Sequence, residues 1–269
     1  MADANHSVVN ITFTPVQSDR MLAGRNIVVT GGASGIGFAM ARKFISVGAQ
    51  VLIADINVES IRKACEALGN SCKGIAFDVC DIEGMDRFLA QAEEKFSGPV
   101  TTLCSNAGIS LHEHGIMEVT PEKFEKQFHI NLRAPFFLVQ SFLKRYEHTE
   151  GRKDILITTS EAGDEGFDRP YGMSKAALDS FITAISHRCY EHGIRINGIA
   201  PGVTITNMTR TNISSTEDNL AYEGVAGRVF RPEEIAEVAC FLVSDAALCI
   251  SGEIIHCNAA AHVRSYYKA

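Results

Sequence analysis

A strand pattern, a glycine-rich turn and a helix pattern follow one another near the start of the chain, and this unit restricts the fold more than any other stretch. Asn26 to Thr30 is a β-branched run typical of a buried strand. The helix pattern runs from Phe38 to Val47 and stops at Gly48, which is suited to a C-cap. The turn between them reads Gly31-Gly32-Ala33-Ser34-Gly35-Ile36-Gly37. Glycines let the backbone approach a ligand and a helix N-terminus favours an anion, so the unit predicts a site for a pyrophosphate.

Strand and helix patterns continue to alternate along the chain. The strand patterns lie at residues 26–30, 50–54, 73–77, 101–105, 154–159, 195–200 and 252–256. The helix patterns lie at 38–47, 58–68, 82–96, 121–146 and 171–190, with a last one from 232. Such alternation predicts a parallel sheet that helices cover on both faces. The expected fold is α/β: a single doubly wound Rossmann-type domain with a mostly parallel seven-stranded sheet.

The domain is expected to occupy residues 21–269, after an N-terminal extension at residues 1–20. Within the extension, Val8 to Val16 is either an edge strand or partner contact, or part of a flexible tail. We find no internal repeat, low-complexity segment or linker.

An acidic residue ends the second predicted strand. Asp55 follows the last glycine of the turn by 18 residues. A carboxylate at this place can accept hydrogen bonds from both hydroxyls of an adenosine ribose, and it would repel a 2′-phosphate. Neither Ser34 nor Ile56 is basic, so the sequence favours NAD over NADP. The alternative is that Asp55 only caps the helix that follows.

Other strand patterns also end in small or polar residues. These residues are Asp78, Asn106, Ser160 and Pro201. Ligands of open parallel sheets bind at the carboxyl ends of the strands, so these positions predict one binding cleft. Asp78 either reaches an adenine amino group or caps a helix. The small residues of Asn106-Ala107-Gly108 would let the backbone lie close to a cofactor.

The pattern at 121–146 contains two irregular residues. Pro135 lies inside it and should kink the helix. Asn131 has low helix propensity, which indicates a polar role. The apolar positions recur every fourth residue and are therefore expected to pack in the core: Phe124, Phe128, Leu132 and Phe136.

Tyr171 and Lys175 lie four residues apart in the next predicted helix, and therefore on one face. A positive charge beside a phenol favours the phenolate and lowers its pKa. A tyrosine of this kind can exchange a proton with an alcohol or a carbonyl near neutral pH. The spacing alone is equally that of two solvent-facing residues, and the strand-end residues supply its context.

Together these motifs resemble those of the short-chain dehydrogenase/reductase superfamily, from about Met21 to Asn258. Thr30-Gly31-x-x-x-Gly35-x-Gly37 matches its cofactor motif. Three more motifs match in the family's order: Asn106-Ala107-Gly108, Tyr171-x-x-x-Lys175 and Pro201-Gly202. The resemblance implies an NAD-dependent oxidoreductase that interconverts a secondary alcohol and a ketone by hydride transfer.

The resemblance also implies four catalytic roles. Tyr171 matches the general acid/base, and Lys175 matches the residue that lowers its pKa and bonds the nicotinamide ribose. Ser160 matches the hydroxyl that holds the substrate oxygen, and Asn131 matches the support of a water-linked proton relay. The implied cofactor contacts are Gly31, Ser34, Gly35, Ile36, Gly37, Asp55, Ile56, Asp78, Val79, Asn106, Ala107, Gly108, Tyr171, Lys175, Pro201, Gly202, Val203, Thr204 and Thr206.

The substrate is expected between the loop before Tyr171 and a lid at about 203–230. The interval from Ser160 to Tyr171 is shorter than in common members of the family, and it is acidic between Glu161 and Asp168. The lid is polar, with Thr211, Asn212 and Ser214 among its residues. These features favour a small polar substrate: a sugar, polyol, cyclitol or hydroxy acid. The expected substrate contacts are Ser160, Glu161, Tyr171 and Met208.

Other interpretations of the same site stay open. The protein could reduce a bulkier acyl, steroid or biosynthetic ketone, or it could be a non-catalytic NAD-sensing protein of this fold. Arg169 or Arg210 could pair a substrate carboxylate. The His112-Glu113-His114 loop either hydrogen-bonds the substrate or is simply exposed. Two alternating histidines are too few for a metal centre, so no metal site is predicted.

Composition and charge bear on the partners. The formal net charge of −7 argues against a nucleic-acid partner, since phosphate binding needs a basic surface. No window approaches the roughly 18 apolar residues of a membrane span. The eight cysteines form no Cys-x-x-Cys pair, and a reduced, cytoplasmic compartment is expected. The resemblance implies a homo-oligomer, a dimer or tetramer, through the helices near 121–145 and 169–192.

Overall fold

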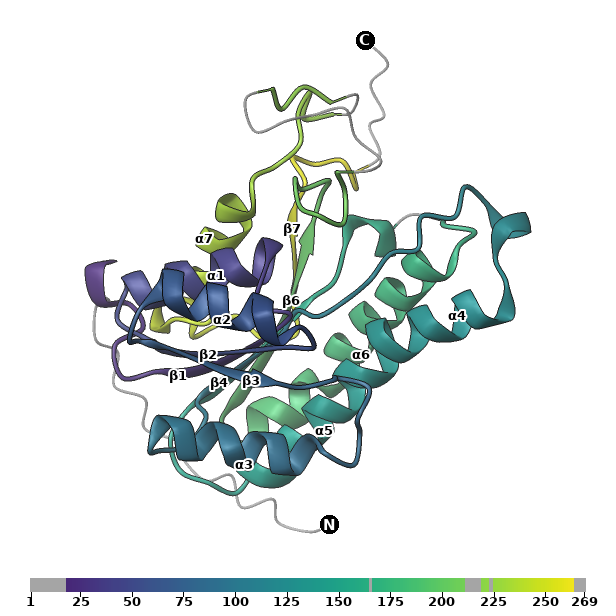
Figure 1. The fold of residues 1–269 in the computed structure, drawn as a ribbon. Coiled ribbons are helices and arrows are strands. Elements are labelled where there is room, and N and C mark those ends of the chain that lie inside the picture. Colours follow the sequence, from purple (N-terminus) through teal and green to yellow (C-terminus); the bar gives the residue numbers. More distant parts are fainter. Residues whose placement is uncertain (1–17, 165, 211–218, 223–224, 264–269) are drawn as a thin grey trace.

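Seven strands form one sheet at the centre of the molecule (Figure 1). The computed structural model describes residues 18–164, 166–210, 219–222 and 225–263. The strand order is β3-β2-β1-β4-β5-β6-β7, and all neighbours pair in parallel. The strands are β1 (Asn26–Thr30), β2 (Gln50–Asp55), β3 (Cys72–Ala76), β4 (Thr102–Ser105), β5 (Lys153–Thr158), β6 (Ile194–Pro201) and β7 (Ile254–Cys257). The predicted Rossmann-type fold is confirmed, with a fully parallel sheet.

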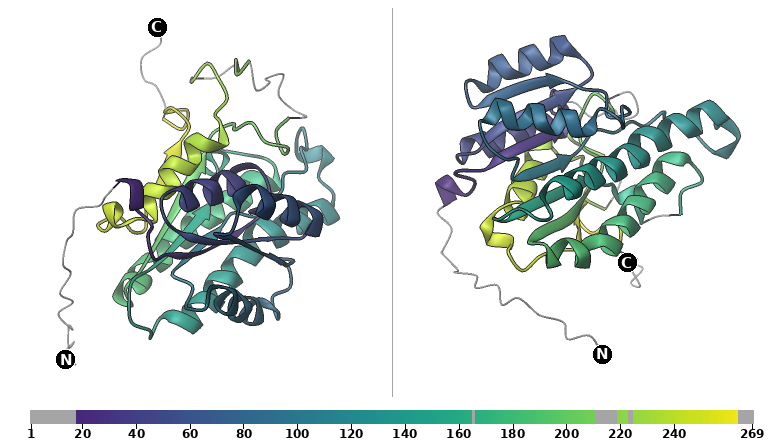
Figure 2. Two further views of the ribbon diagram at one scale, coloured as in Figure 1. Left: turned by 60° about the vertical axis from the view of Figure 1, so that its left-hand side comes forward. Right: turned by 90° about the horizontal axis from the view of Figure 1, so that it is seen from below.

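Helices cover both faces of the sheet (Figure 2). One face carries α1 (Gly35–Ser46), α2 (Val58–Leu68) and α7 (Pro232–Leu242). The other face carries α3 (Met85–Phe96), α5 (Ala134–Tyr146) and α6 (Pro170–Glu191), with α4 (Pro121–Phe128) leading into α5. The strand order reverses between β1 and β4, and a crevice at the carboxyl ends is expected at such a switch point.

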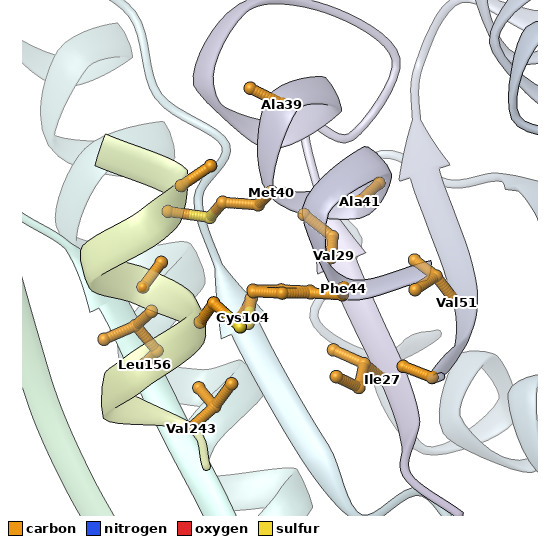
Figure 3. Packing of buried hydrophobic residues seen from close by; sticks show 14 of the residues in the cluster. Ile27, Val29, Ala39, Met40, Ala41, Phe44, Val51, Cys104, Leu156 and Val243 are labelled. Carbon is orange, nitrogen blue, oxygen red and sulfur yellow. The ribbon is translucent and has the colours of Figure 1, made fainter. Parts of the chain in front are cut away.

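The two cores lie on either side of the sheet because successive residues of a strand point to opposite faces. In β1, Val29 belongs to one cluster and Val28 to the other. Burial on both faces explains why these strands are continuous apolar runs. In Figure 3, the side chains of Met40 and Phe44 extend from α1 toward α7 and the sheet.

The segment predicted as one kinked helix is divided. A π-helical turn, His129–Arg133, separates α4 from α5. Pro135 is the second residue of α5, directly after this turn, and its missing N–H interrupts the i→i−4 hydrogen bonding there.

Two of the four predicted core positions of this segment are wrong, while Leu132 does pack against the core. Phe124 and Phe136 are 41% and 39% exposed, whereas Gln127 and Asn131 are buried. The spacing of the apolar residues identified one face of the helix. The adjacent face, which carries Gln127 and Asn131, is the one that is fully buried. Phe136 instead contacts Phe181 of α6, with ring centroids 4.7 Å apart.

Some predictions fall on residues outside the described ranges. These are the alternatives for Val8 to Val16, the lid residues Thr211, Asn212 and Ser214, and Glu165 of the acidic loop. Within the ranges that the structure describes, no helix has the length and apolar character needed to cross a membrane.

Candidate active site

A cavity of about 900 Å³ opens at the carboxyl ends of the strands. Nearly all of the predicted site residues line it: Gly31, Ser34, Gly35, Ile36, Asp55, Ile56, Asp78, Val79, Asn106, Ala107, Gly108, Ser160, Glu161, Tyr171, Lys175, Pro201, Gly202, Val203, Thr204, Thr206 and Met208. Gly37 and Asn131 are not part of its wall. The fold therefore brings the predicted residues together, while their individual roles stay predictions.

The glycine-rich turn forms a tight cradle at the start of α1. Gly31 has a φ of +62°, and a Cβ there would lie 3.0 Å from Cα of Ala107. A Cβ on Gly37 would collide with the carbonyl oxygen of Gly31, so this glycine lets α1 pack on the turn. The first backbone N–H groups of α1, at Gly35 and Ile36, lie in the cavity wall. The cradle has the room and the free donors that a pyrophosphate requires.

A hydrogen-bond network joins the ends of three strands beside this turn. The hydroxyl of Thr30 accepts the backbone N–H groups of Asn106 (3.0 Å) and Ala107 (3.2 Å). The amide of Asn106 donates to the carbonyl oxygens of Thr30 (3.2 Å) and Gly31 (3.3 Å), and it accepts the hydroxyl of Thr158 at 3.0 Å. The sequence indicated only that residues 106–108 are small. The network shows that Asn106 also holds β1, β4 and β5 in place.

Asp55 lies where β2 meets the cavity. Its Oδ1 accepts the backbone N–H of Asn57 at 3.2 Å. The N-cap of α2 is Asn57, whose side chain accepts the N–H of Ser60 at 2.9 Å. The alternative role of Asp55 as the cap of this helix is therefore wrong. Asp78 likewise accepts the N–H of Cys80 at 2.9 Å and does not cap α3, whose N-cap is Gly84.

Tyr171 and Lys175 lie on one face of α6. Nζ of Lys175 is 5.9 Å from the centre of the Tyr171 ring and donates to the carbonyl oxygen of Thr158 at 2.8 Å. Lys175 is buried, and Tyr171 is half-buried. Ser160 follows β5, and its Oγ accepts the N–H of Ala162 at 3.2 Å.

The protein environment moves the pKa of both residues. Burial raises the pKa of Tyr171, and the charge of Glu161 raises it further, while a hydrogen bond with Ser160 opposes the rise. Burial lowers the pKa of Lys175 to about 8, and Asp179 opposes that change. The pKa of Tyr171 is thus raised and not lowered as expected, because burial disfavours the phenolate.

Asn131 lies in the π-helical turn and is buried. Its side chain donates to the carbonyl oxygen of Ile109 and accepts the N–H of the same residue, both at 2.8 Å. Its amide also lies 3.4 Å from Oγ of Ser174. Asn131 therefore fixes the loop after β4 against α6, and its part in a proton relay stays a prediction.

Comparisons with known proteins agree with this geometry. A family model described as enoyl-(acyl carrier protein) reductase matches residues 31–262. Versicolorin reductase stcU of Emericella nidulans is 33% identical over 256 residues, which cover 87% of this chain and 94% of that protein. The chain belongs to the short-chain dehydrogenase/reductase superfamily. It is accordingly an oxidoreductase of a family that acts on carbonyl or hydroxyl groups with a nicotinamide cofactor, NAD or NADP.

Two further matches extend the comparison. L-rhamnose 1-dehydrogenase (NAD(P)(+)) of a Sphingomonas species is 29% identical and covers 87% of this chain and 94% of its own. The crystal structure of 3-ketoacyl-(acyl-carrier-protein) reductase from Brucella melitensis, complexed with NADH, superimposes with a TM-score of 0.81 at 24% identity. That alignment covers 90% of this chain and 100% of the Brucella chain, which shows the common fold.

In this dehydrogenase/reductase, two loops meet beside Tyr171. Nη1 of Arg169 donates to the carbonyl oxygen of Glu113 at 2.9 Å, and the guanidinium lies 4.4 Å from the centre of the Phe167 ring. Asp168 accepts the N–H of Ile116 at 3.2 Å. A small pocket of about 90 Å³ lies between the loops beside Tyr171. Its walls are Ser110, His112, Glu113, His114, Phe167, Arg169 and Tyr171.

Sequence reasoning missed several residues of the large cavity: Phe77, Ile109, Ser110, Ile130, Thr158, Thr159, Ala162, Phe167, Val225 and Ala261. Most lie within two residues of a predicted site residue, before or after it, so proximity to such a residue was the signal available. Phe167 and Ala261 reach the cavity only through loop conformation. Among the described residues, no three or more metal-ligating side chains come together. His112 and His114 are therefore not part of such a group.

Proposed function

We propose that this protein is an NAD-dependent dehydrogenase/reductase that interconverts a secondary alcohol and a ketone, with a small polar substrate. The observation that supports this most is the arrangement of one cavity: Asp55 lies at one end, and Ser160, Tyr171 and Lys175 converge at the other. The volume of about 900 Å³ suits a dinucleotide together with a small second molecule.

The side chains have complementary tasks in the proposed reaction. In the oxidation direction, the phenolate of Tyr171 takes the proton of the substrate hydroxyl. Ser160 accepts the N–H of Ala162, so its own hydrogen can be donated to the oxygen on which charge develops. The ammonium group of Lys175, which donates to the carbonyl oxygen of Thr158, supplies a positive charge near the ring of Tyr171. The nicotinamide ring, when bound, accepts the hydride.

The choice of NAD rests on charge. The carboxylate of Asp55 would repel a 2′-phosphate. Lys175 is the only lysine or arginine among the described residues that line the cavity, and it lies at the catalytic end.

The choice of a polar substrate rests on the walls beside Tyr171. Ser110, His112 and Glu161 line the cavity there, and Arg169 borders the adjoining pocket. The relative named L-rhamnose 1-dehydrogenase is consistent with this class. A second candidate is the reduction of a bulkier ketone. It is favoured by the apolar residues Phe167, Met208, Tyr222 and Val225 in the same wall, and by the relative named versicolorin reductase.

A panel of polar alcohols and bulky ketones, each assayed with NAD(H) and NADP(H) at the nicotinamide absorbance, tests the proposal. We expect polar alcohols and NAD to be preferred. Preference for NADP would contradict the role of Asp55, and activity confined to bulky ketones would select the second candidate.

The variant Tyr171→Phe should lose at least about 100-fold in kcat, since acid–base catalysis contributes 10²–10⁴-fold. Its dissociation constant for NAD, measured by fluorescence, should stay within about twofold, because a phenyl ring keeps the wall. Turnover that survives this substitution would exclude Tyr171 as the acid/base.

We also propose a homo-oligomer, a dimer or tetramer, built through α4, α5 and α6. The exposed aromatic residues Phe124 and Phe136 lie on these helices, and such a patch is typical of an interface. The cytoplasmic location remains part of the proposal, supported by the free state of the eight cysteines.

A further inference from the structure

A second cluster of titratable side chains lies next to Lys175, outside the cavity wall. Asp179 follows Lys175 by one helical turn on the same face of α6. Asp164 follows a 3₁₀ turn, Glu161–Gly163, and His256 belongs to β7. Nε2 of His256 lies 2.6 Å from Oδ2 of Asp164. The cluster thus joins β7 to the 3₁₀ turn and α6, two segments that are near each other in the sequence but distant from β7.

The carboxylate of Asp179 is packed closely between these segments. A Cβ on Gly163 would lie 2.5 Å from Oδ2 of Asp179 and 3.2 Å from the carbonyl carbon of Lys175. The 3₁₀ turn therefore presses directly on the part of α6 that carries the lysine. Oδ1 of Asp179 is buried and has no hydrogen-bond partner within the described part of the chain.

Burial and several neighbouring groups shift the pKa of Asp179. Burial and the charge of Asp164 raise its pKa to about 6. The hydroxyl of Thr159 and the charges of Lys175 and His256 oppose the rise. In return, Asp179 favours the ammonium form of Lys175, whose pKa burial lowers to about 8. A buried carboxylate with an unpaired oxygen lowers the stability of the folded state. Residues that lower stability in this way concentrate at functional sites.

We propose that Asp179 is a positioning residue: its carboxylate keeps Lys175 in the ammonium form, and the Asp164–His256 pair sets how readily that carboxylate ionises. The inference rests on the proposed function, in which Lys175 supports the phenolate of Tyr171. Asp179 touches neither reactant and acts only through the lysine. Below the pKa of Asp179, about 6, Lys175 is ammonium without this support, so the support matters as the pH approaches the pKa of Lys175, about 8.

The test uses the variant Asp179→Asn, which keeps the size and removes the charge. The ratio of wild-type to variant kcat/KM should rise from near one at about pH 5.5 to about fivefold at about pH 8 and approach tenfold at higher pH, as a fall of one unit in the pKa of Lys175 requires. A carboxylate with a merely structural role would give a ratio that does not change with pH, and that result would overturn the proposal.

Two measurements need no turnover. The folded pKa of Asp179 lies above its ordinary value of 3.8, so the folded state is disfavoured as pH rises through that interval. The variant should therefore melt higher than the wild type by roughly 2–4 °C at about pH 8, and the gain should vanish at about pH 4. Lower stability of the variant at every pH would overturn the proposal.

The titration of Lys175, followed by NMR of ¹³C-labelled lysine and assigned with Lys175→Arg, should move to lower pH in the variant. If the Lys175 titration shifts but the protein turns over no alcohol or ketone, the proposed function is rejected and this inference stands. Turnover with an unmoved titration would overturn this inference alone.

Two further variants complete the experiment. His256→Gln keeps a donor toward Asp164 but removes the positive charge that favours the Asp179 carboxylate, so the titration of Asp179, followed by NMR of ¹³C-labelled aspartate, should move to higher pH. An unmoved titration would overturn the part assigned to His256. Asp86→Asn, at an exposed carboxylate on α3, makes the same charge change away from the site and should leave the ratio near one. A pH-dependent ratio in this control would overturn the assignment to Asp179.

Discussion

The hydroxyl of Thr30 links the cofactor turn to the strand that carries Asn106. It accepts two backbone N–H groups, from Asn106 and Ala107, and is itself fully buried. Valine has the same shape but cannot accept a hydrogen bond. The link between the cofactor turn and residues 106–107 therefore depends on the hydroxyl oxygen of Thr30.

We expect Thr30→Val to lower the free energy of unfolding by about 1–3 kcal/mol for each N–H that is left unpaired. Affinity for NAD should fall about tenfold, because the same two N–H groups shape the cavity wall. Calorimetry and a fluorescence titration measure the two effects. Thr30→Ser keeps the oxygen and serves as the matched control. Equal losses in both variants would mean that the methyl group matters and the hydroxyl does not.

At the scale of elements, Arg195 of β6 anchors the connection from α7 to β7. Its guanidinium donates to the carbonyl oxygens of Leu242 (2.8 Å), Ser244 (3.2 Å), Ala247 (2.6 Å) and Ile250 (3.0 Å). It also pairs with Asp154 at 2.5 Å, and both side chains are buried. The end of α7 and the following segment, which includes the 3₁₀ turn Asp245–Ala247, are thus tied to the sheet by one side chain.

Arg195→Met should destabilise the protein by about 3–5 kcal/mol, since it leaves Asp154 buried without this partner and four carbonyls without their donor. Urea unfolding measures the loss. Arg42→Met is the control, because Arg42 forms an exposed pair with Glu233 at 2.6 Å and should cost less than about 1 kcal/mol. Similar losses at the two sites would contradict the role of Arg195.

The helix segment around Asn131 shows the limit of periodicity at this scale. The apolar spacing correctly predicted helix before and after the π-helical turn. It also assigned Phe124 and Phe136 to the core although they are exposed, because a repeat of apolar residues looks the same whether the protein or a partner covers it. The buried face carries Gln127 and Asn131, whose burial depends on hydrogen bonds to distant backbone.

At the scale of the whole molecule, the aromatic surface of α4, α5 and α6 is where we expect subunits to meet. Phe136→Glu places a charge in this surface and should convert the oligomer into monomers. Light scattering coupled to size exclusion measures the mass, and circular dichroism checks the fold. Val58→Glu, at a residue of α2 that is 67% exposed, is the control and should keep the native mass. An unchanged mass for Phe136→Glu would place the interface elsewhere or leave the protein monomeric.

The sequence by itself determined the fold class, the succession of strands and helices, and the set of residues at the strand ends. These follow from local rules: the period of apolar residues, the glycines of the first turn and the place where each strand stops. Strand ends agreed with the structure within one or two residues; β3, for example, covers 72–76 instead of 73–77.

Only the tertiary structure decided which side chains meet across the chain. Asp164 and His256 are 92 residues apart, and they pair because the chain returns to add β7 beside β6. The cap of α2 is Asn57 and not Asp55, because the Asn57 side chain is the one placed to accept the N–H of Ser60 in the first turn. Burial set the pKa of Tyr171 and Lys175 more strongly than their spacing did, since solvent exclusion belongs to the assembled fold and cannot be deduced from two positions on one helix.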